Sequence, residues 1–166
     1  MKFIGLLSDT HSYYHPKLES FFKEVDEIWH AGDIGSIGIL DRLKQFKPTK
    51  AVWGNIDGTN IRLELKGTEI FYCDKVKVML THIGGYPGHY HSGIKKKLKE
   101  EQIQLFISGH SHILKVMNDP SLNLLHMNPG SAGIQGIHQR ITMLRFKIDG
   151  NRIEDLEVYD APRKEN

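Results

Sequence analysis

Short apolar runs and amphipathic stretches alternate along the first third of the chain. Residues 2–8 form an apolar run that stops at polar residues, which is typical of a buried strand. The pattern then predicts a helix with Pro16 near its first turn, a strand over 27–31, a second helix that ends before Pro48, and a strand over 50–53. This order of strands and helices indicates parallel pairing and a layered α/β arrangement.

The remaining two thirds of the chain are richer in strands. Hairpins are predicted around Asp74-Lys75 and Asp149-Gly150, where turn residues separate apolar runs. The other predicted elements are a charged helix over 94–102 and strands over 105–108, 113–117 and 122–127. The simplest architecture is a mixed sheet, or two sheets, covered by helices. From Pro162 onward we expect a frayed end.

Length and composition fit an ordinary globular protein. The chain has 166 residues, 39% of them apolar and 25% charged, so we expect one domain spanning 1–166. The net charge of +2 gives no strong field toward nucleic acid or membrane. Cys73 is the only cysteine, and the first apolar run ends too early for a signal peptide. We therefore expect a cytoplasmic protein.

Seven side chains that can bind a metal ion lie in five short clusters, each after a predicted strand. They are Asp9, His11, Asp33, Asn55, His82, His110 and His112. Because the carboxyl ends of parallel strands meet at one edge of a sheet, we expect these clusters to converge. Asp9 and His11 are two positions apart, so an extended backbone would turn both to one side, and His110 and His112 repeat that spacing. Carboxylate, amide and imidazole ligands suit two divalent cations.

Each cluster also has a simpler explanation when it is taken alone. Asp9 is typical of a helix cap, and Gly32-Asp33 is typical of a turn. Asn55 after a glycine fits turn chemistry, and a single histidine is more often structural than catalytic. The ordered occurrence of all five clusters after successive strands favours the metal site.

The combined motifs resemble those of a known family. They are Asp9-x-His11, Gly32-Asp33, Gly54-Asn55-x-Asp57, Thr81-His82 and Gly109-His110-x-His112, followed by Asn128-Pro129-Gly130-Ser131. In this order they resemble the signature of the calcineurin-like metallophosphoesterases, in particular the small YfcE-type phosphodiesterase branch. The resemblance implies a four-layer αββα sandwich of two mixed β-sheets flanked by helices, with a binuclear metal centre at one edge.

The resemblance also implies how the ligands are shared between two metal ions. Asp9, His11, Asp33 and His112 would hold the first ion. Asp33, Asn55, His82 and His110 would hold the second, with Asp33 as the bridge. Manganese is the ion expected from the family, and the nitrogen and oxygen ligands also permit nickel, cobalt, iron or zinc.

Such a centre implies hydrolysis of a phosphate ester. Two cations lower the pKa of a water molecule that bridges them, and the hydroxide attacks phosphorus while the cations offset the developing charge. Asp33, Asn55 and His82 would act through this hydroxide and by positioning the phosphate. The expected substrate is a small phosphodiester.

Several positions depart from the pattern or extend it. Larger phosphatases of the superfamily carry a histidine after the asparagine, whereas this chain has Ile56, which favours diesters or activated esters. Asp57 fits both a catalytic role, orienting a metal-bound water, and a structural turn. His89, in a segment rich in tyrosine and histidine, is a candidate for the missing acid, although an exposed loop explains that segment equally simply. His30 fits either support of the site or strand packing.

Two other functions compete with catalysis. The same fold serves as a protein-interaction scaffold in a subunit of the eukaryotic retromer coat, whose metal site is degraded, whereas this chain keeps all seven ligands. Nucleic-acid binding is disfavoured, because the basic run Lys95 to Lys99 is followed at once by Glu100 and Glu101. The resemblance further implies a homo-oligomer, either a dimer or a tetramer.

Overall fold

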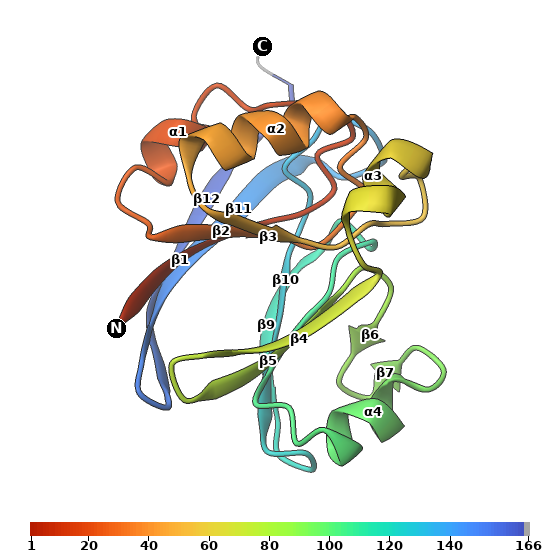
Figure 1. The fold of residues 1–166 in the computed structure, drawn as a ribbon, viewed down its shortest axis with the longest axis vertical. Helices are drawn as coiled ribbons and strands as arrows, with labels where there is room; N and C mark the ends of the chain where they lie inside the picture. Colours follow the sequence, from red (N-terminus) through yellow and green to blue (C-terminus); the bar gives the residue numbers. More distant parts are fainter. Residues whose placement is uncertain (165–166) are drawn as a thin grey trace.

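The computed structural model describes residues 1–164, and Figure 1 shows two β-sheets packed face to face with helices outside them. The first sheet has the order β12-β11-β1-β2-β3. Its strands are β1 (Lys2–Leu7), β2 (Glu27–His30), β3 (Thr49–Ala51), β11 (Arg140–Asp149) and β12 (Arg152–Pro162). The three strands β1, β2 and β3 run parallel, and β11 and β12 are antiparallel to their neighbours. Helices α1 (Leu18–Phe21) and α2 (Ile37–Phe46) cover its outer face.

The second sheet repeats this mixed arrangement in the order β4-β5-β8-β10-β9. Its strands are β4 (Thr68–Cys73), β5 (Val76–Thr81), β8 (Leu105–Ile107), β9 (Leu114–Asp119) and β10 (Leu124–Pro129). Strands β5, β8 and β10 are parallel, and the two edge strands are antiparallel. Helix α4 (Ile94–Glu100) covers the outer face, so the four-layer αββα sandwich is confirmed.

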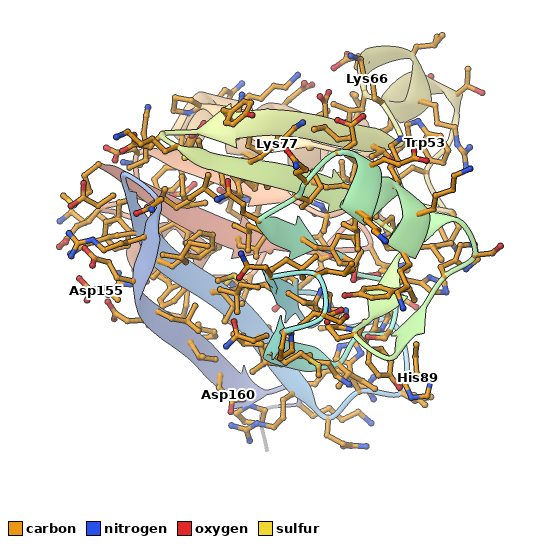
Figure 2. All side chains as sticks on the ribbon, turned by 90° about the horizontal axis from the view of Figure 1, so that it is seen from below. Trp53, Lys66, Lys77, His89, Asp155 and Asp160 are labelled. Carbon is orange, nitrogen blue, oxygen red and sulfur yellow. The ribbon has the colours of Figure 1, made fainter. Side chains whose placement is uncertain are left out.

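The sequence pattern did not predict two short elements. Helix α3 (Thr59–Glu64) buries only Ile61 within its span, so it has no apolar face that a periodicity could reveal. The segment with His89 forms a hairpin of β6 (Gly85–Tyr86) and β7 (His89–Tyr90), too short for alternation to show. Figure 2, seen from below, shows His89 on this hairpin and Asp155 on the opposite side of the molecule.

The end of the chain is more ordered than the sequence predicted. Pro162 is the last residue of β12, opposite Arg140, and the N–H of Arg163 donates to the carbonyl of Gln139 at 3.0 Å. The expected fraying from Pro162 onward is therefore wrong for these two residues, because β11 extends far enough to pair with them. Residues 165–166 lie outside the described part of the chain.

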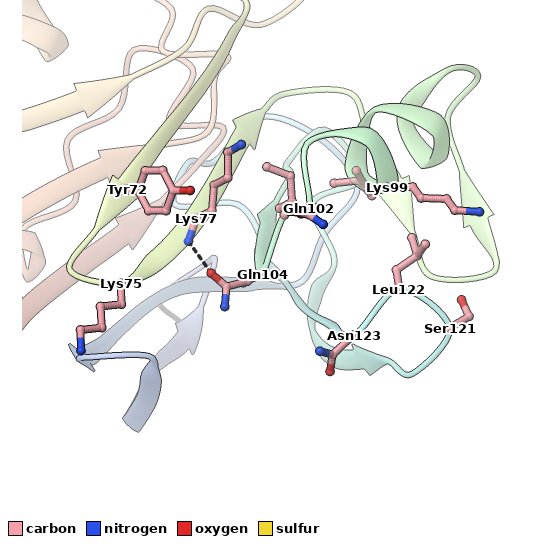
Figure 3. Close-up of a pocket in the computed structure, with 11 residues that line it drawn as sticks. Tyr72, Lys75, Lys77, Lys99, Gln102, Gln104, Ser121, Leu122 and Asn123 are labelled. Atoms are coloured by element: carbon pink, nitrogen blue, oxygen red, sulfur yellow. Dashed lines mark hydrogen bonds between the residues drawn. The ribbon is translucent and has the colours of Figure 1, made fainter.

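A surface groove lies beside α4, on the side of the β4–β5 hairpin (Figure 3). It encloses about 600 Å³, and its charged side chains include Lys75, Lys77 and Lys99. Lys77 forms an ion pair with Glu101, with 3.0 Å between Nζ and Oε2. Among the described residues, none of the seven candidate ligands lines this groove. It is therefore separate from the candidate ligands.

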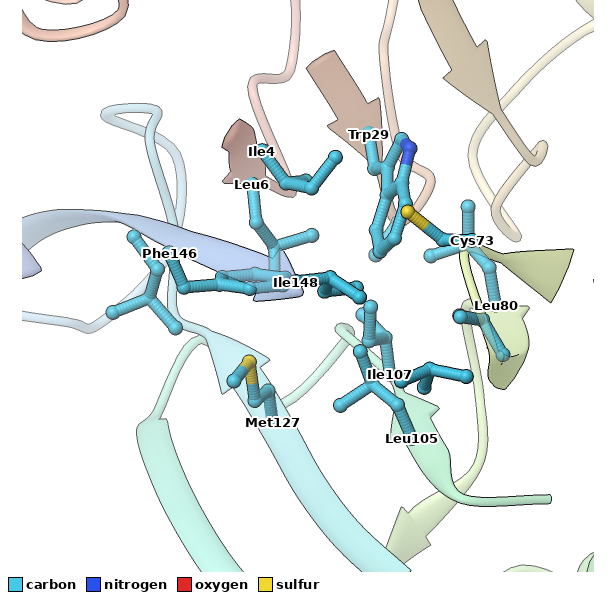
Figure 4. Packing of buried hydrophobic residues seen from close by; sticks show 14 of the residues in the cluster. Ile4, Leu6, Trp29, Cys73, Leu80, Leu105, Ile107, Met127, Phe146 and Ile148 are labelled. Atoms are coloured by element: carbon cyan, nitrogen blue, oxygen red, sulfur yellow. The ribbon is translucent and has the colours of Figure 1, made fainter. Parts of the chain in front are cut away.

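Apolar side chains fill the space between the two sheets (Figure 4). The first sheet contributes Ile4, Leu6 and Trp29, and the second contributes Leu80 and Leu105, all of them fully buried. Cys73 packs in the same cluster, and its burial raises the pKa of the thiol to about 11. A thiol of this kind is a packing group.

The strand register brings the polar clusters to one edge of the sandwich. Leu7 of β1 lies opposite His30 of β2, and His30 lies opposite Ala51 of β3, so these three strands end together. In the second sheet, Leu80 of β5 lies opposite Ile107 of β8. All five predicted ligand clusters begin just after these strand ends. No helix in the described residues is both long and apolar enough to cross a lipid bilayer.

The core between the sheets can be tested with a matched pair of substitutions. Leu80 is fully buried, whereas Leu63 on α3 is 82% exposed. Leu80→Ala should lower the free energy of unfolding by about 2–5 kcal/mol, because it removes buried contacts and leaves a cavity. Leu63→Ala should change it by less than about 0.5 kcal/mol. Urea unfolding measures both, and equal effects would contradict the packing described here.

Candidate metal centre

Six of the seven candidate ligands form two compact groups. The ligand atoms of Asp9, His11 and His112 all lie within 4.8 Å of one another, and so do those of Asp33, His82 and His110. The seventh, Asn55, is adjacent, with its Oδ1 3.1 Å from Nδ1 of His110. Loops after five strands, three in one sheet and two in the other, deliver these side chains. The predicted convergence is therefore present in the structure.

Asp33 lies between the two groups. Its Oδ2 is 3.5 Å from Nε2 of His11, in the first group, and 3.2 Å from Nε2 of His82, in the second. Asp9 faces the same space, with its Oδ1 3.2 Å from Nε2 of His112 and 3.8 Å from Nε2 of His82. The two groups are thus contiguous, and a carboxylate at Asp33 can serve both.

Hydrogen bonds occupy one oxygen of each carboxylate and leave the other facing the cluster. Oδ2 of Asp9 accepts from the Ser8 hydroxyl at 2.6 Å and from the His110 N–H at 3.1 Å. Oδ1 of Asp33 accepts from the Ile56 N–H at 3.0 Å. The remaining oxygens, Oδ1 of Asp9 and Oδ2 of Asp33, are oriented for a shared ligand.

Backbone carbonyls set the orientation of two imidazoles. Nδ1 of His82 donates to the carbonyl of Ala31 at 2.8 Å, which leaves the Nε2 lone pair for the cluster. His112 is held through a second histidine: Nε2 of His138 donates to the Gly133 carbonyl at 2.7 Å, so Nδ1 of His138 can accept from Nδ1 of His112 at 3.1 Å. His138 fitted no ligand pattern in the sequence, because only the fold brings it beside His112.

Three polar atoms at the centre of the cluster are buried without a hydrogen-bond partner among the described residues. They are Oδ1 of Asp9, Nε2 of His11 and Nε2 of His82. Buried polar atoms are rarely left unpaired, because each one loses its interaction with water. Carboxylate oxygens and imidazole nitrogens are ligands for divalent transition metals, and no thiolate is present among them. The residues therefore fit metal ions.

The electrostatics of the cluster favour positive charge. Burial alone would raise the pKa of Asp9, but the imidazoles of His11 and His112 outweigh it and hold that pKa well below its usual range. Burial alone would also raise the pKa of Asp33, but His82 and the Ile56 N–H outweigh it, so this pKa is lowered as well. For His82, burial is outweighed by Asp33 and Asp9, which raise its pKa. Both carboxylates are anionic at neutral pH, the form that binds cations.

The backbone at the ligands differs from the expected extended form. Asp9 and His11 have φ angles of 55° and 45°, and His110 and His112 have 71° and 62°. The prediction that extended backbone aligns each pair is wrong, although the side chains do converge. Left-handed backbone at a residue other than glycine is strained, and Asp and His are among the residues that adopt it most readily. Two hydrogen bonds hold this conformation: the N–H of Asp9 donates to the Gly32 carbonyl, and the N–H of His11 donates to the Asp33 carbonyl.

Two glycines of the motifs allow close approach of the loops. A Cβ atom at Gly54 would overlap Oδ1 of Asp33. A Cβ atom at Gly109 would lie 2.8 Å from Oδ2 of Asp9 and would overlap the hydroxyl of Ser8. The glycines before Asn55 and His110 are therefore required by packing around the carboxylates.

Asp57 and His30 support the ligand loops from behind. The carboxylate of Asp57 is buried and accepts the N–H groups of Gly54 at 2.8 Å, Gly35 at 2.8 Å and Ile34 at 3.2 Å. It thereby ties the loop after β2 to the loop after β3, which corresponds to the structural role considered for it. Burial lowers the pKa of His30 to about 4, so its ring is neutral.

The neutral ring of His30 connects the first two ligand loops. Its Nδ1 accepts from the Gly32 N–H at 3.1 Å, and Nε2 donates to the Thr10 hydroxyl at 3.0 Å. Thr10 in turn donates to the carbonyl of Ile34 at 2.9 Å. His30 therefore combines the two roles that the sequence left open, since it is packed at a strand end and also supports the site.

Two positions bear on the leaving group. The side chain of Ile56 is 46% exposed, while its N–H holds Asp33. His89 is exposed on β7, with its ring 4.9 Å from that of Tyr86. An acid role for His89 stays a prediction.

Comparisons with known proteins agree with this geometry. The family model described as the calcineurin-like phosphoesterase superfamily domain matches residues 1–151. A probable metallophosphoesterase from Methanothermobacter thermautotrophicus is 29% identical over 158 residues, covering 91% of this chain and 88% of the relative. The solved structure of YfcE, a phosphoesterase from E. coli, has a TM-score of 0.66 at 17% identity, covering 93% and 98% of the two chains. Vps29 from Chaetomium thermophilum has a TM-score of 0.74 at 12% identity, covering 97% of each. At these identities the two structures show the shared fold alone.

The supporting role of Asp57 can be measured as stability. Asp57→Asn replaces one carboxylate oxygen with an NH₂ group, which leaves at least one buried N–H without an acceptor. The free energy of unfolding of metal-free protein should fall by about 1–3 kcal/mol. Asp41→Asn, at an exposed position of α2, is the matched control and should change it by less than about 0.5 kcal/mol. Similar urea midpoints for the two variants would show that the Asp57 carboxylate contributes little.

Proposed function

This chain belongs to the calcineurin-like phosphoesterase superfamily, and we propose that it hydrolyses small phosphate diesters at a site holding two divalent cations. The observation that carries the proposal is the group of three buried, unpartnered atoms on Asp9, His11 and His82. They face one space from loops of both sheets. A cation there would satisfy all three at once, whereas among the described residues they face only the carboxylates and imidazoles of the cluster itself, at 3.2–3.8 Å.

The proposed ligand sets follow the two groups of side chains. The first cation would be held by Asp9, His11, Asp33 and His112, and the second by Asp33, Asn55, His82 and His110. The position of Oδ2 of Asp33 between His11 and His82 supports its role as the shared ligand. Manganese is the proposed ion, with nickel, cobalt, iron or zinc as alternatives of similar ligand preference.

When bound, two divalent cations would activate water as the nucleophile and offset negative charge on the phosphoryl oxygens. The side chains orient the components of that reaction. The Ile56 N–H fixes the Asp33 carboxylate, and the Ala31 carbonyl fixes the His82 ring. Asn55 and His110 are the exposed members of the cluster, so they face an arriving substrate and are proposed to position its phosphoryl oxygens.

The proposal favours diesters because of Ile56. An exposed isoleucine beside Asp33 cannot donate a proton to a departing alkoxide, and general acid catalysis contributes about 100- to 10,000-fold when the leaving group is poor. A diester with at least one good leaving group is less dependent on such an acid. His89 remains the proposed substitute, because it is exposed on the hairpin after His82.

A scaffold without catalysis is the alternative function. The fold shared with Vps29 is compatible with it, but fold alone does not carry function. The complete set of seven ligand side chains and their support by His138, His30 and Asp57 favour catalysis. Metal binding and turnover, measured on the same preparation, separate the two functions.

Metal dependence is the direct test of the proposal. Adding Mn²⁺ at about 100 times its Kd should raise the free energy of unfolding by about 2.7 kcal/mol and should start turnover of bis(p-nitrophenyl) phosphate. Asp33→Asn should remove the stabilisation and lower kcat/KM at least about 100-fold, because the shared ligand loses its charge. Asp41→Asn, the same change at an exposed position of α2, should preserve both the stabilisation and the turnover. Full stabilisation by Mn²⁺ without any turnover would favour the scaffold.

The leaving-group argument has its own test. Ile56→His should raise turnover of phenyl phosphate, an aryl monoester with a poor leaving group, relative to bis(p-nitrophenyl) phosphate by about 10-fold or more, because the new imidazole can assist departure. Since the side chain is 46% exposed, the substitution should leave the unfolding temperature nearly unchanged. A constant ratio of the two rates in a folded, Mn²⁺-stabilised variant would remove this argument.

A further inference from the structure

A small cavity of about 170 Å³ opens beside the metal cluster, on the outer face of the second sheet. His110 lines it, and the ring of His110 lies 5.2 Å from that of His82. Its apolar walls include Ile83, Tyr86 and Ile113. None of these three side chains is fully buried, so they are accessible to a ligand. We call this cavity the outer-face pocket.

The floor of the outer-face pocket carries an unpartnered polar atom. His126 lines the pocket and is 0% exposed. Its Nδ1 donates to the carbonyl of Phe106 at 3.1 Å, and its Nε2 has no hydrogen-bond partner among the described residues. Burial lowers the pKa of His126 to about 4, so the ring is neutral and Nε2 carries a lone pair. The pocket therefore offers a buried hydrogen-bond acceptor.

A cation lies on the same wall as this acceptor. In the antiparallel pair of β9 and β10, Lys115 is opposite Asn128 and Met117 is opposite His126, so Lys115 and His126 point to the same face of the sheet. Lys115 also lines the pocket, and its Nζ lies 3.5 Å from the centre of the Tyr86 ring. A donor on Lys115, next to the Tyr86 ring, and an acceptor on His126 thus lie on one face of the sheet and line the same pocket.

The hairpin that carries Tyr86 is fastened to the sheet on both sides. The hydroxyl of Ser108 donates to the carbonyl of Gly85 at 3.0 Å. The hydroxyl of Tyr90 donates to the carboxylate of Asp119 at 2.6 Å. The backbone on both sides of Tyr86 is therefore held in place before any ligand arrives, which reduces the entropy lost on binding.

We propose that the outer-face pocket binds one arm of the diester substrate, a planar heterocycle whose edge presents an N–H beside a carbonyl oxygen. The N–H donates to Nε2 of His126, the carbonyl accepts from the ammonium of Lys115, and the ring contacts Tyr86 and the two isoleucines. Pyrimidine bases such as uracil and thymine have this edge. The inference rests on the proposed function, because His110 connects the pocket to the cluster where the phosphate would lie.

Three chromogenic esters with the same leaving group test the proposal. They are bis(p-nitrophenyl) phosphate, thymidine 5′-(p-nitrophenyl phosphate) and its N3-methyl analogue, in which the N–H is replaced. Wild-type protein with Mn²⁺ should hydrolyse the thymidine ester with a kcat/KM at least about 10-fold above that of the N3-methyl ester, mainly through KM, because a methyl group leaves the buried acceptor unpaired.

Two substitutions test whether His126 causes the preference between the two thymidine esters. His126→Phe keeps a ring but removes the acceptor, and the ratio of kcat/KM for the two thymidine esters should fall to about 1. His126→Gln returns a carbonyl oxygen near the position of Nε2 and should restore part of the ratio. Because each ratio is taken within one variant, a general loss of activity does not affect it. Stabilisation by Mn²⁺ checks that each variant is folded.

The outcomes separate the pocket from the reaction. Turnover of bis(p-nitrophenyl) phosphate without a preference between the thymidine esters overturns the pocket proposal and leaves the proposed function standing. An unchanged preference in His126→Phe overturns it as well. If no ester is hydrolysed, the proposed function fails, and binding of thymidine 5′-monophosphate against its N3-methyl analogue decides the pocket. Equal binding of the two nucleotides would overturn the pocket proposal, because water and not the base would then satisfy His126.

Discussion

Two buried carboxylates that share the same neighbours set the main constraint on this molecule. Asp9 and Asp33 both face His11 and His82, at distances between 3.2 and 3.8 Å. Placing two negative charges together away from water is unfavourable unless positive charge lies between them. The surrounding imidazoles and backbone N–H groups supply part of that compensation. The remaining unpartnered atoms define where cations would complete it.

The rest of the fold holds these groups in place. The apolar layer between the sheets fixes the loops after β1, β2 and β3 opposite those after β5 and β8. Left-handed backbone at the ligands is maintained by bonds to neighbouring loops, and Asp57 and His30 connect those loops from behind. Asp33, His82 and His112 are each oriented by a hydrogen-bond partner outside the proposed ligand sets, which restricts the motion of these side chains.

The proposed reaction and the proposed substrate recognition occupy different parts of the structure. The ligand cluster lies at strand ends, where two sheets meet. The outer-face pocket lies on the solvent side of one sheet, under a short hairpin, and uses side chains of β9 and β10. Since His110 borders both, the two parts can act on one substrate while their residues change independently. Such a separation would let one set of ligands accompany different substrates on one fold.

The sequence by itself indicated a layered α/β fold and placed seven candidate ligands after predicted strands, because strands leave a local apolar pattern and the ligand residues follow it directly. The four-layer sandwich came from the resemblance of the combined motifs to a known family. The sequence also indicated that Ile56 cannot act as an acid. It did not reveal α3, which buries a single side chain, or the short β6–β7 hairpin. The left-handed backbone at Asp9 and His11 contradicted the local spacing argument. His138, His126 and the ordered end of β12 depended on partners distant in the chain. Contacts of that kind leave no mark on neighbouring residues, so only the tertiary structure decided them.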